Sequence, residues 1–350
     1  MILNLVKIFL PTTLTFLIGI LITPTLSHFF YKYSLWKKKA RTSGEEMSAD
    51  FTKIHNTESE LHTPRVGGVI IWIAILLCAG IMFLLSRFVP GDIAQKLDFL
   101  SRGQTLIPLG ALILGAVIGL IDDLLQVTGH GSYAADNINY RKVKIIAVTV
   151  IAVLISLWFF VKLDISSIHI PFAGSWELGV FFIPVFVLVM LAVFSSSVID
   201  GLDGLSGGVL ATVFAAYAGI AFGQNHIDLA ALCAVITGGI LAFLWFNIPP
   251  ARFYMGETGM LGLTVVLAVV AFLTDTVLLL PIIAFPLFVT SLSVILQINS
   301  KKYFKRKIFR VAPLHHHFKA LGWSSERVVM RYWVVSIIAS LLGMVIALIS

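Results

Sequence analysis

The stretch Thr105 to Asp123, TLIPLGALILGAVIGLIDD, decides the fold class of this chain. Residues 105–121 carry no charge, and two aspartates follow them directly. A helix needs roughly 20 apolar residues to cross the hydrocarbon core of a bilayer, so we interpret this run as a membrane span. Similar runs recur along the chain and predict an all-α protein with about ten transmembrane helices, near residues 8–30, 66–86, 105–121, 144–161, 179–199, 207–223, 229–246, 259–273, 277–298 and 328–349.

The composition agrees with a polytopic membrane protein and excludes an ordinary soluble domain. Of the 350 residues, 58% are hydrophobic and only 12% are charged, and the mean hydropathy is +0.97. Polar surface would be too scarce to cover such a chain in water. We therefore predict a single transmembrane domain over residues 1–350, with a retained first helix. The only cysteines, Cys78 and Cys233, lie inside apolar runs, so a disulfide framework is not expected.

The net charge of +7 reflects membrane topology rather than nucleic-acid binding, because the basic residues lie in short loops and form no basic domain. Of the 25 lysines and arginines, 20 fall in five alternate segments. Basic loops stay in the cytoplasm, so these segments are predicted to be cytoplasmic and both termini to lie outside. The five predicted cytoplasmic segments are residues 31–65, 122–144, 200–206, 247–258 and 299–331, and we expect the active site to be built from them.

The same five segments hold the acidic residues that border predicted spans. Acids beside hydrocarbon are costly, and their one-sided placement predicts that they converge. The alternative is that ordinary loops simply contain some acids. The converging set is Asp122, Asp123, Asp200, Asp203 and Glu257, accompanied by His315, His316 and His317.

Two acidic motifs carry most of the chemical argument. Asp122-Asp123 suits a metal or a base with an orienting neighbour, although a solvated helix end would look the same. Asp200 and Asp203 are three residues apart and would share one face of a helical turn. The glycines beside them would let a ligand approach the backbone, which helix packing does not require.

Two further segments permit more than one reading. Phe253 and Tyr254 could anchor the chain at the membrane interface or stack on a nucleobase. Three successive histidines cannot all point the same way, so they alone make an improbable zinc site. A phosphate-binding or proton-handling role is favoured over a plain polar loop. Hard carboxylates with nearby basic residues suit magnesium and phosphates, and hence phosphoryl transfer.

Five motifs in order resemble the polyprenyl-phosphate sugar-1-phosphate transferases over nearly the whole chain. The triple histidine followed by phenylalanine looks most like the phospho-N-acetylmuramoyl-pentapeptide transferase branch. The motifs are Thr63-Pro64-Arg65-Val66-Gly67-Gly68, Asp122-Asp123, Asp200-Gly201-Leu202-Asp203-Gly204, Asn247 with Met255-Gly256-Glu257-Thr258-Gly259, and His315-His316-His317-Phe318.

The resemblance implies a reaction, a cofactor and a location. The family moves phospho-N-acetylmuramoyl-pentapeptide from UDP-MurNAc-pentapeptide to undecaprenyl phosphate, releasing UMP and making lipid I. It uses Mg2+ at the cytoplasmic face of the cell (inner) membrane. Its members span the membrane ten times and are often homodimers.

The resemblance also implies roles for individual residues. Glu257 stands at the magnesium position, with Asp200 as a further ligand, and Asp122 matches the carboxylate proposed to deprotonate the lipid phosphate. Asp123, Asp200 and His316 would complete the catalytic set. Tyr254 falls where an aromatic ring stacks on uracil. The other substrate-binding positions are Thr63, Asp203, Asn247, Gln297, His315 and His317.

The chain departs from the family pattern at several positions. Glu257 replaces an aspartate, which keeps the charge but reaches one methylene further. Gln126 replaces a lysine that would neutralise phosphate. Further departures are Phe194 and Ser197 in place of asparagines and Glu60-Leu61 where a lysine is usual.

Three competing functions remain open at this stage. A related enzyme using UDP-N-acetylglucosamine is disfavoured by the triple histidine. A transporter would place its ionisable residues near the bilayer midplane, whereas these lie at one surface. A catalytically inactive scaffold is suggested by Gln126 and the lost asparagines.

Overall fold

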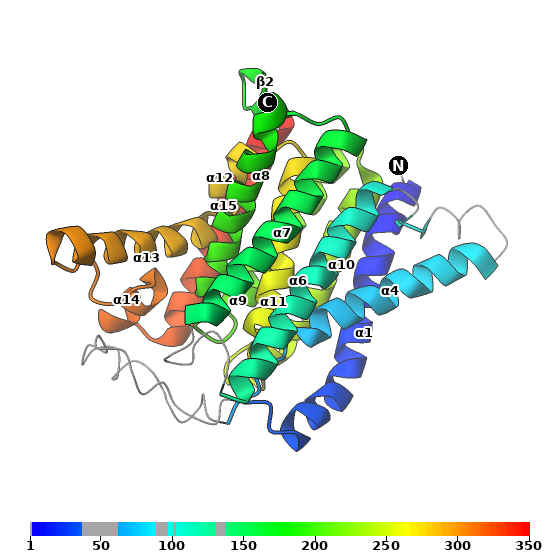
Figure 1. Cartoon of the computed structure of the whole chain (residues 1–350). Coiled ribbons are helices and arrows are strands. Elements are labelled where there is room, and N and C mark those ends of the chain that lie inside the picture. The colour runs from blue at the N-terminus through cyan, green and yellow to red at the C-terminus, as the bar shows by residue number, and fades with distance from the viewer. Residues whose placement is uncertain (1, 37–61, 89–96, 101–102, 130–137) are drawn as a thin grey trace.

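A computed structural model describes residues 2–36, 62–88, 97–100, 103–129 and 138–350. The expectations for Glu60 and Leu61, and for the parts of segments 31–65 and 122–144 that fall in the gaps, lie outside these residues. Within them the chain is a bundle of long helices with one small hairpin (Figure 1).

The helices of the bundle coincide with the predicted apolar runs, and the all-α prediction is confirmed. Nine of the described helices are long and apolar enough to cross a membrane, or ten spans if one bent pair is counted as a span. Several begin earlier than predicted, since the first starts at Ile2 rather than residue 8. The nine are α1 (Ile2–Lys32), α4 (Val69–Phe88), α6 (Gly103–Val127), α7 (Ile138–Lys162), α8 (Phe182–Ser195, with η1 Gly179–Phe181 and η2 Ser196–Ile199 at its ends), α9 (Leu205–Gly223), α10 (Ile227–Asn247), α11 (Gly256–Leu273) and α15 (Ser325–Ile349).

The predicted span at 277–298 is present as a bent pair of helices. The segment is broken into η3 (Val277–Leu279), α12 (Leu280–Ile283) and α13 (Phe285–Phe304), and the two halves meet at 89°. Pro286 sits in the first turn of α13, where a proline is tolerated but cannot continue the preceding helix. As a result α13 leaves the side of the bundle (Figure 1).

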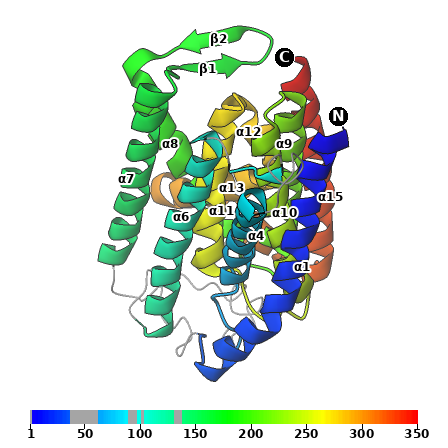
Figure 2. The same cartoon turned by 90° about the vertical axis from the view of Figure 1, so that its right-hand side faces the viewer.

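Segment 162–178 contains an antiparallel hairpin. Strands β1 (Ser167–Ile170) and β2 (Gly174–Glu177) pair with Ser167 opposite Glu177. The hairpin lies at the same end of the bundle as both chain termini (Figure 2). The even number of crossings predicted from the sequence agrees with this arrangement, while the side of the membrane stays a prediction.

Helix α11 forms the centre of the bundle, and every one of its residues is buried. A helix that is apolar all round belongs in the interior of a bundle, and α6, α8 and α9 all pack against this one. The short helix α14 (Leu314–Ala320) lies between α13 and α15, near the end of the bundle that is opposite the hairpin (Figure 1). This end carries the predicted acidic and histidine-rich segments.

Candidate active site

Close packing of α6 against α11 brings two acidic motifs together. A Cβ added at Gly119 would lie 2.1 Å from the carbonyl oxygen of Glu257, and one at Gly115 would lie 2.9 Å from the Cα of Gly262. Small residues one turn apart let two membrane helices approach backbone to backbone. Because this contact continues to the end of α6, the side chains that follow Gly119 meet the first turn of α11.

Asp123 is fully buried and is held by that first turn. Its Oδ2 accepts hydrogen bonds from the backbone N–H of Thr258 at 2.8 Å and from the Thr258 hydroxyl at 2.7 Å. The helix N-terminus offers unsatisfied N–H groups to a carboxylate, which is why an acid is stable here. Its Oδ1 makes no hydrogen bond to any residue that the structure describes. One oxygen thus fixes the carboxylate, and the other has no hydrogen-bond partner among the described residues.

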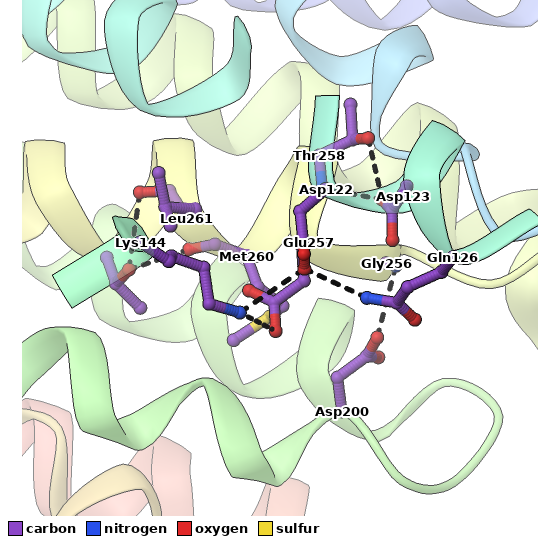
Figure 3. A network of polar contacts seen from close by, with 11 residues as sticks. Asp122, Asp123, Gln126, Lys144, Asp200, Gly256, Glu257, Thr258, Met260 and Leu261 are labelled. Atoms are coloured by element: carbon purple, nitrogen blue, oxygen red, sulfur yellow. Dashed lines mark hydrogen bonds and ion pairs between the residues drawn. The ribbon is translucent and has the colours of Figure 1, made fainter. Parts of the chain in front are cut away.

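Asp122 and Glu257 are joined by a lysine from a third helix (Figure 3). The Nζ of Lys144, on α7, lies 2.9 Å from Oε1 of Glu257 and 3.3 Å from Oδ2 of Asp122. Gln126 donates from Nε2 to the same Asp122 oxygen at 2.9 Å. All of these side chains are largely buried, so the two carboxylates share one cation with little solvent screening.

Lys144 was not singled out from the sequence, and it changes the interpretation of Gln126. The resemblance suggested that a cation was lost at Gln126, whereas the structure supplies one from α7. The only sequence signal was a lysine in the first two turns of an apolar span, where a charge is expensive without a partner.

Asp200 lies beside the same turn of α11. Its Oδ2 accepts from the backbone N–H of Gly256 at 3.1 Å, and its Oδ1 accepts from the hydroxyl of Ser206 at 2.7 Å. Burial raises the pKa of Asp200 above that of an ordinary carboxyl, while the Ser206 hydrogen bond and the charge of Arg65 act in the opposite direction. Gly256 has a φ of +67°, and a Cβ there would lie 2.5 Å from Oδ2 of Asp123. Asp123 and Asp200 therefore both lie beside Gly256.

Asp203 and Asn247 tie the loops together. Asp203 accepts from the backbone N–H of Ala251 at 3.2 Å, and burial raises its pKa. Asn247 accepts from the backbone N–H of Gly204 at 2.9 Å and donates to the carbonyl of Phe253 at 2.8 Å. Both side chains span the loop after η2 and the loop after α10, so in this structure they fix loop geometry.

The histidine run begins the helix α14, so the plain polar loop is ruled out. His315 and His316 are buried, with ring centroids 4.3 Å apart. A Cβ added at Gly201 would lie 2.5 Å from Nε2 of His315, so the glycine is needed for this close approach. His317 points elsewhere, because its Nδ1 accepts from the backbone N–H of Arg310 at 3.1 Å. The prediction that the three rings do not all point the same way is confirmed.

Both readings of Phe253 are wrong. The ring is fully buried among Phe30, Phe243 and Phe246, so it neither anchors at an interface nor stacks on a base. The loop sequence alone could not indicate this aromatic cluster, because the rings of the cluster come from α1, α10 and the loop after α10. Its neighbour Tyr254 is only partly buried.

The remaining predicted positions are described by their contacts with the backbone of other segments. The backbone of Tyr254 pairs with the segment after Thr63, since its N–H donates to Pro64 and its carbonyl accepts from Gly67, at 2.8 and 2.9 Å. Gln297 is buried on α13 and bonds the backbone of Ile308 and Phe309. No group of three His, Cys, Asp or Glu side chains among the described residues stands ready to hold a metal ion by itself.

Comparison with known proteins shows which family the chain is similar to. Residues 105–275 match the model of glycosyl transferase family 4. A phospho-N-acetylmuramoyl-pentapeptide-transferase of Caldanaerobacter subterraneus subsp. tengcongensis is 35% identical over 95% of this chain and 96% of its own length. The protein of that name from Geobacillus thermodenitrificans is 32% identical over 97% of this chain and 97% of its own length. The one from Chloroflexus aurantiacus is 33% identical over 90% of this chain and 85% of its own length.

The chain belongs to the phospho-N-acetylmuramoyl-pentapeptide transferase family. The segment that matches the family model, residues 105–275, contains all five acids of the predicted cluster. The histidine run lies beyond this segment. The family assignment makes the chain a membrane transferase of peptidoglycan synthesis.

Proposed function

We propose that this chain transfers phospho-N-acetylmuramoyl-pentapeptide from its UDP carrier to undecaprenyl phosphate, giving lipid I and UMP. One observation carries the proposal: carboxylates from α6 and α11 share Lys144 of α7 at one end of the bundle, and Asp200, which follows η2, contacts the same first turn of α11. The relatives are named for the transfer of phospho-N-acetylmuramoyl-pentapeptide, and we take the donor group from that name. The excess of lysine and arginine in the segments at this end supports a cytoplasmic site in the cell (inner) membrane.

The donor set fits magnesium held jointly by protein and substrate. Mg2+ usually takes one or two carboxylates, with substrate phosphates and water completing six oxygens. Oδ1 of Asp123 and Oε2 of Glu257 are buried carboxylate oxygens that no described residue hydrogen-bonds, and we assign them as the protein ligands. When bound there, the ion would offset charge on the donor diphosphate.

Asp200 contributes differently under this proposal. Both of its oxygens already accept hydrogen bonds, one of them from the Gly256 N–H. We therefore assign it to orienting the first turn of α11, and through it Glu257. The extra methylene of Glu257, compared with the family aspartate, lets one carboxylate face Lys144 with Oε1 and a ligand with Oε2.

Asp122 and Lys144 would act on the lipid phosphate. Asp122 accepts the proton from that phosphate, and the phosphate oxygen then attacks the β-phosphorus of the donor with UMP as leaving group. Lys144 lies between Asp122 and Glu257, so its ammonium can balance charge that moves between acceptor and donor. His315 and His316 lie against Gly201 and would face the donor phosphates from the other side.

The substrate contacts follow the family pattern. Tyr254 is proposed to stack on uracil, and Thr63, Asp203, Asn247, Gln297, His315 and His317 to line or shape the donor site. A homodimer is part of the same proposal. Sedimentation or light scattering of the detergent-solubilised protein would measure the oligomeric state independently of activity.

The deciding experiment is a transfer assay on the purified full chain. With UDP-MurNAc-pentapeptide, undecaprenyl phosphate and Mg2+, it should release UMP and form lipid I in equal amounts, and chelation should stop both. UDP-N-acetylglucosamine should neither replace the donor nor compete with it. A folded protein that releases no UMP with any polyprenyl-phosphate acceptor would overturn the proposal.

A further inference from the structure

Two arginines share one tryptophan ring at the start of α15. The guanidinium carbons of Arg327 and Arg331 lie 4.9 and 4.3 Å from the ring centroid of Trp323. Phe318 stacks on the same indole, with centroids 4.8 Å apart and planes 17° from parallel. We call Phe318, Trp323, Arg327 and Arg331 the arginine ledge.

The ledge adjoins the candidate active site. Phe318 directly follows the histidine run, whose first ring abuts Gly201. The charge of Lys319, on the same helix, acts on Asp203. From α15, Trp333 donates from Nε1 to the carbonyl of Gly204 at 3.1 Å. Both helices that build the ledge therefore also contact the 200–204 loop.

The ledge is arranged to meet an anion with several oxygens. A guanidinium group carries its N–H donors in its own plane, where they match a carboxylate bidentately, and it can keep them while it stacks on an aromatic face. Both arginines are exposed, and the salt bridges within the described part of the chain involve neither. Two like charges on one ring repel each other, and a bound anion relieves that repulsion.

We propose that the arginine ledge binds carboxylates of the donor's peptide. This inference rests on the proposed function, because it assigns a place to the peptide of the same donor. Under the proposed function, the acids would hold the magnesium ion that offsets the diphosphate charge, with Lys144 and the buried histidines beside it. The peptide must extend away from this diphosphate site. The ledge lies just beyond those histidines and offers both cations for carboxylates and aromatic surface for small apolar side chains.

The test compares a donor that carries the peptide with one that lacks it. The double variant Arg327→Gln/Arg331→Gln should raise the KM for UDP-MurNAc-pentapeptide about tenfold and leave kcat within about twofold, since tenfold corresponds to ~1.4 kcal/mol of binding. The inhibition constant of UDP-MurNAc without peptide should stay unchanged. Arg331→Lys keeps the charge but not the planar fork and should give an intermediate KM.

Arg87→Gln is the matched control, because Arg87 also stacks on an aromatic ring, that of Phe83, at 5.5 Å. It should leave all constants unchanged. Equal effects of the double variant on the peptide-bearing and peptide-free ligands would overturn the inference. So would a change confined to the KM for undecaprenyl phosphate, or to the dependence on anionic lipid, which would indicate lipid headgroups. Absence of turnover in the unmodified protein would instead refute the proposed function.

Discussion

Replacing Lys144 by methionine tests the arrangement of the acidic cluster most directly. Methionine has nearly the same length and removes only the charge. The ammonium lies 2.9 Å from Glu257 and 3.3 Å from Asp122, and its side chain is 11% exposed. Without it, two buried carboxylates would face each other and an anionic substrate with no shared cation.

The size of the effect follows from this geometry. A charge pair about 4 Å apart is worth roughly 4 kcal/mol at an effective dielectric constant of about 20. Removing one partner of a buried pair typically costs about 3–5 kcal/mol. Because one cation serves both acids, the two contacts do not add. We expect a loss of about 3 kcal/mol in transition-state stabilisation, or roughly 100-fold in kcat/KM.

The assay is UMP release by the purified variant, with thermal unfolding as the measure of folding. Lys162→Met is the matched control, since Lys162 is exposed at the far end of the same helix. It should change kcat/KM by less than about twofold. Lys144→Arg should retain part of the activity. A folded Lys144→Met protein within about threefold of the unmodified rate would refute the role given to this lysine.

Three further substitutions test other contacts of the site. Thr258→Val removes one of the two hydrogen bonds to Asp123 and should lower kcat by about 10- to 100-fold, while Thr258→Ser retains activity in the same UMP assay. Gly201→Ala should displace the first histidine and lower kcat/KM by at least about tenfold, whereas Gly80→Ala, where a Cβ meets nothing within 4 Å, should be silent. Burial lowers the pKa of His317, so its stabilising effect is complete above pH ~6.5 and is lost as the pH falls through its lowered pKa. His317→Asn keeps an acceptor for the backbone N–H and should flatten the fall of the unfolding temperature on acidification; an unchanged slope would contradict this assignment.

The fold class follows from the sequence because membrane insertion is decided locally. A run of about 20 apolar residues is stable as a spanning helix whatever its neighbours are. For the same reason the loops that hold Asp122, Asp200 and Glu257 alternate correctly to one end of the bundle.

The break between α12 and α13 could not be predicted from hydropathy. Hydropathy treats residues 277–298 as one run, yet the backbone turns by 89° beside Pro286. Length and apolarity do not encode direction. Packing of α12 against α15 and of α13 against η2 sets the bend.

The contacts inside the site depend on helix rotation and on distances that no single segment contains. Asp123 and Thr258 are 135 residues apart, and only the glycine contact between α6 and α11 brings them together. The sequence suggested a surface position for Phe253, whereas rings from two other segments, α1 and α10, bury it.

By itself the sequence determined that the chain is a helical membrane protein whose acids and histidines lie at one end, because hydrophobic transfer acts on each segment separately. Only the tertiary structure decided that Lys144 pairs with Asp122 and Glu257 beside Gln126, and that Asp200 accepts a hydrogen bond from the first turn of α11. Those assignments depend on which faces of α6, α7 and α11 meet, and packing of small residues across distant helices fixes that.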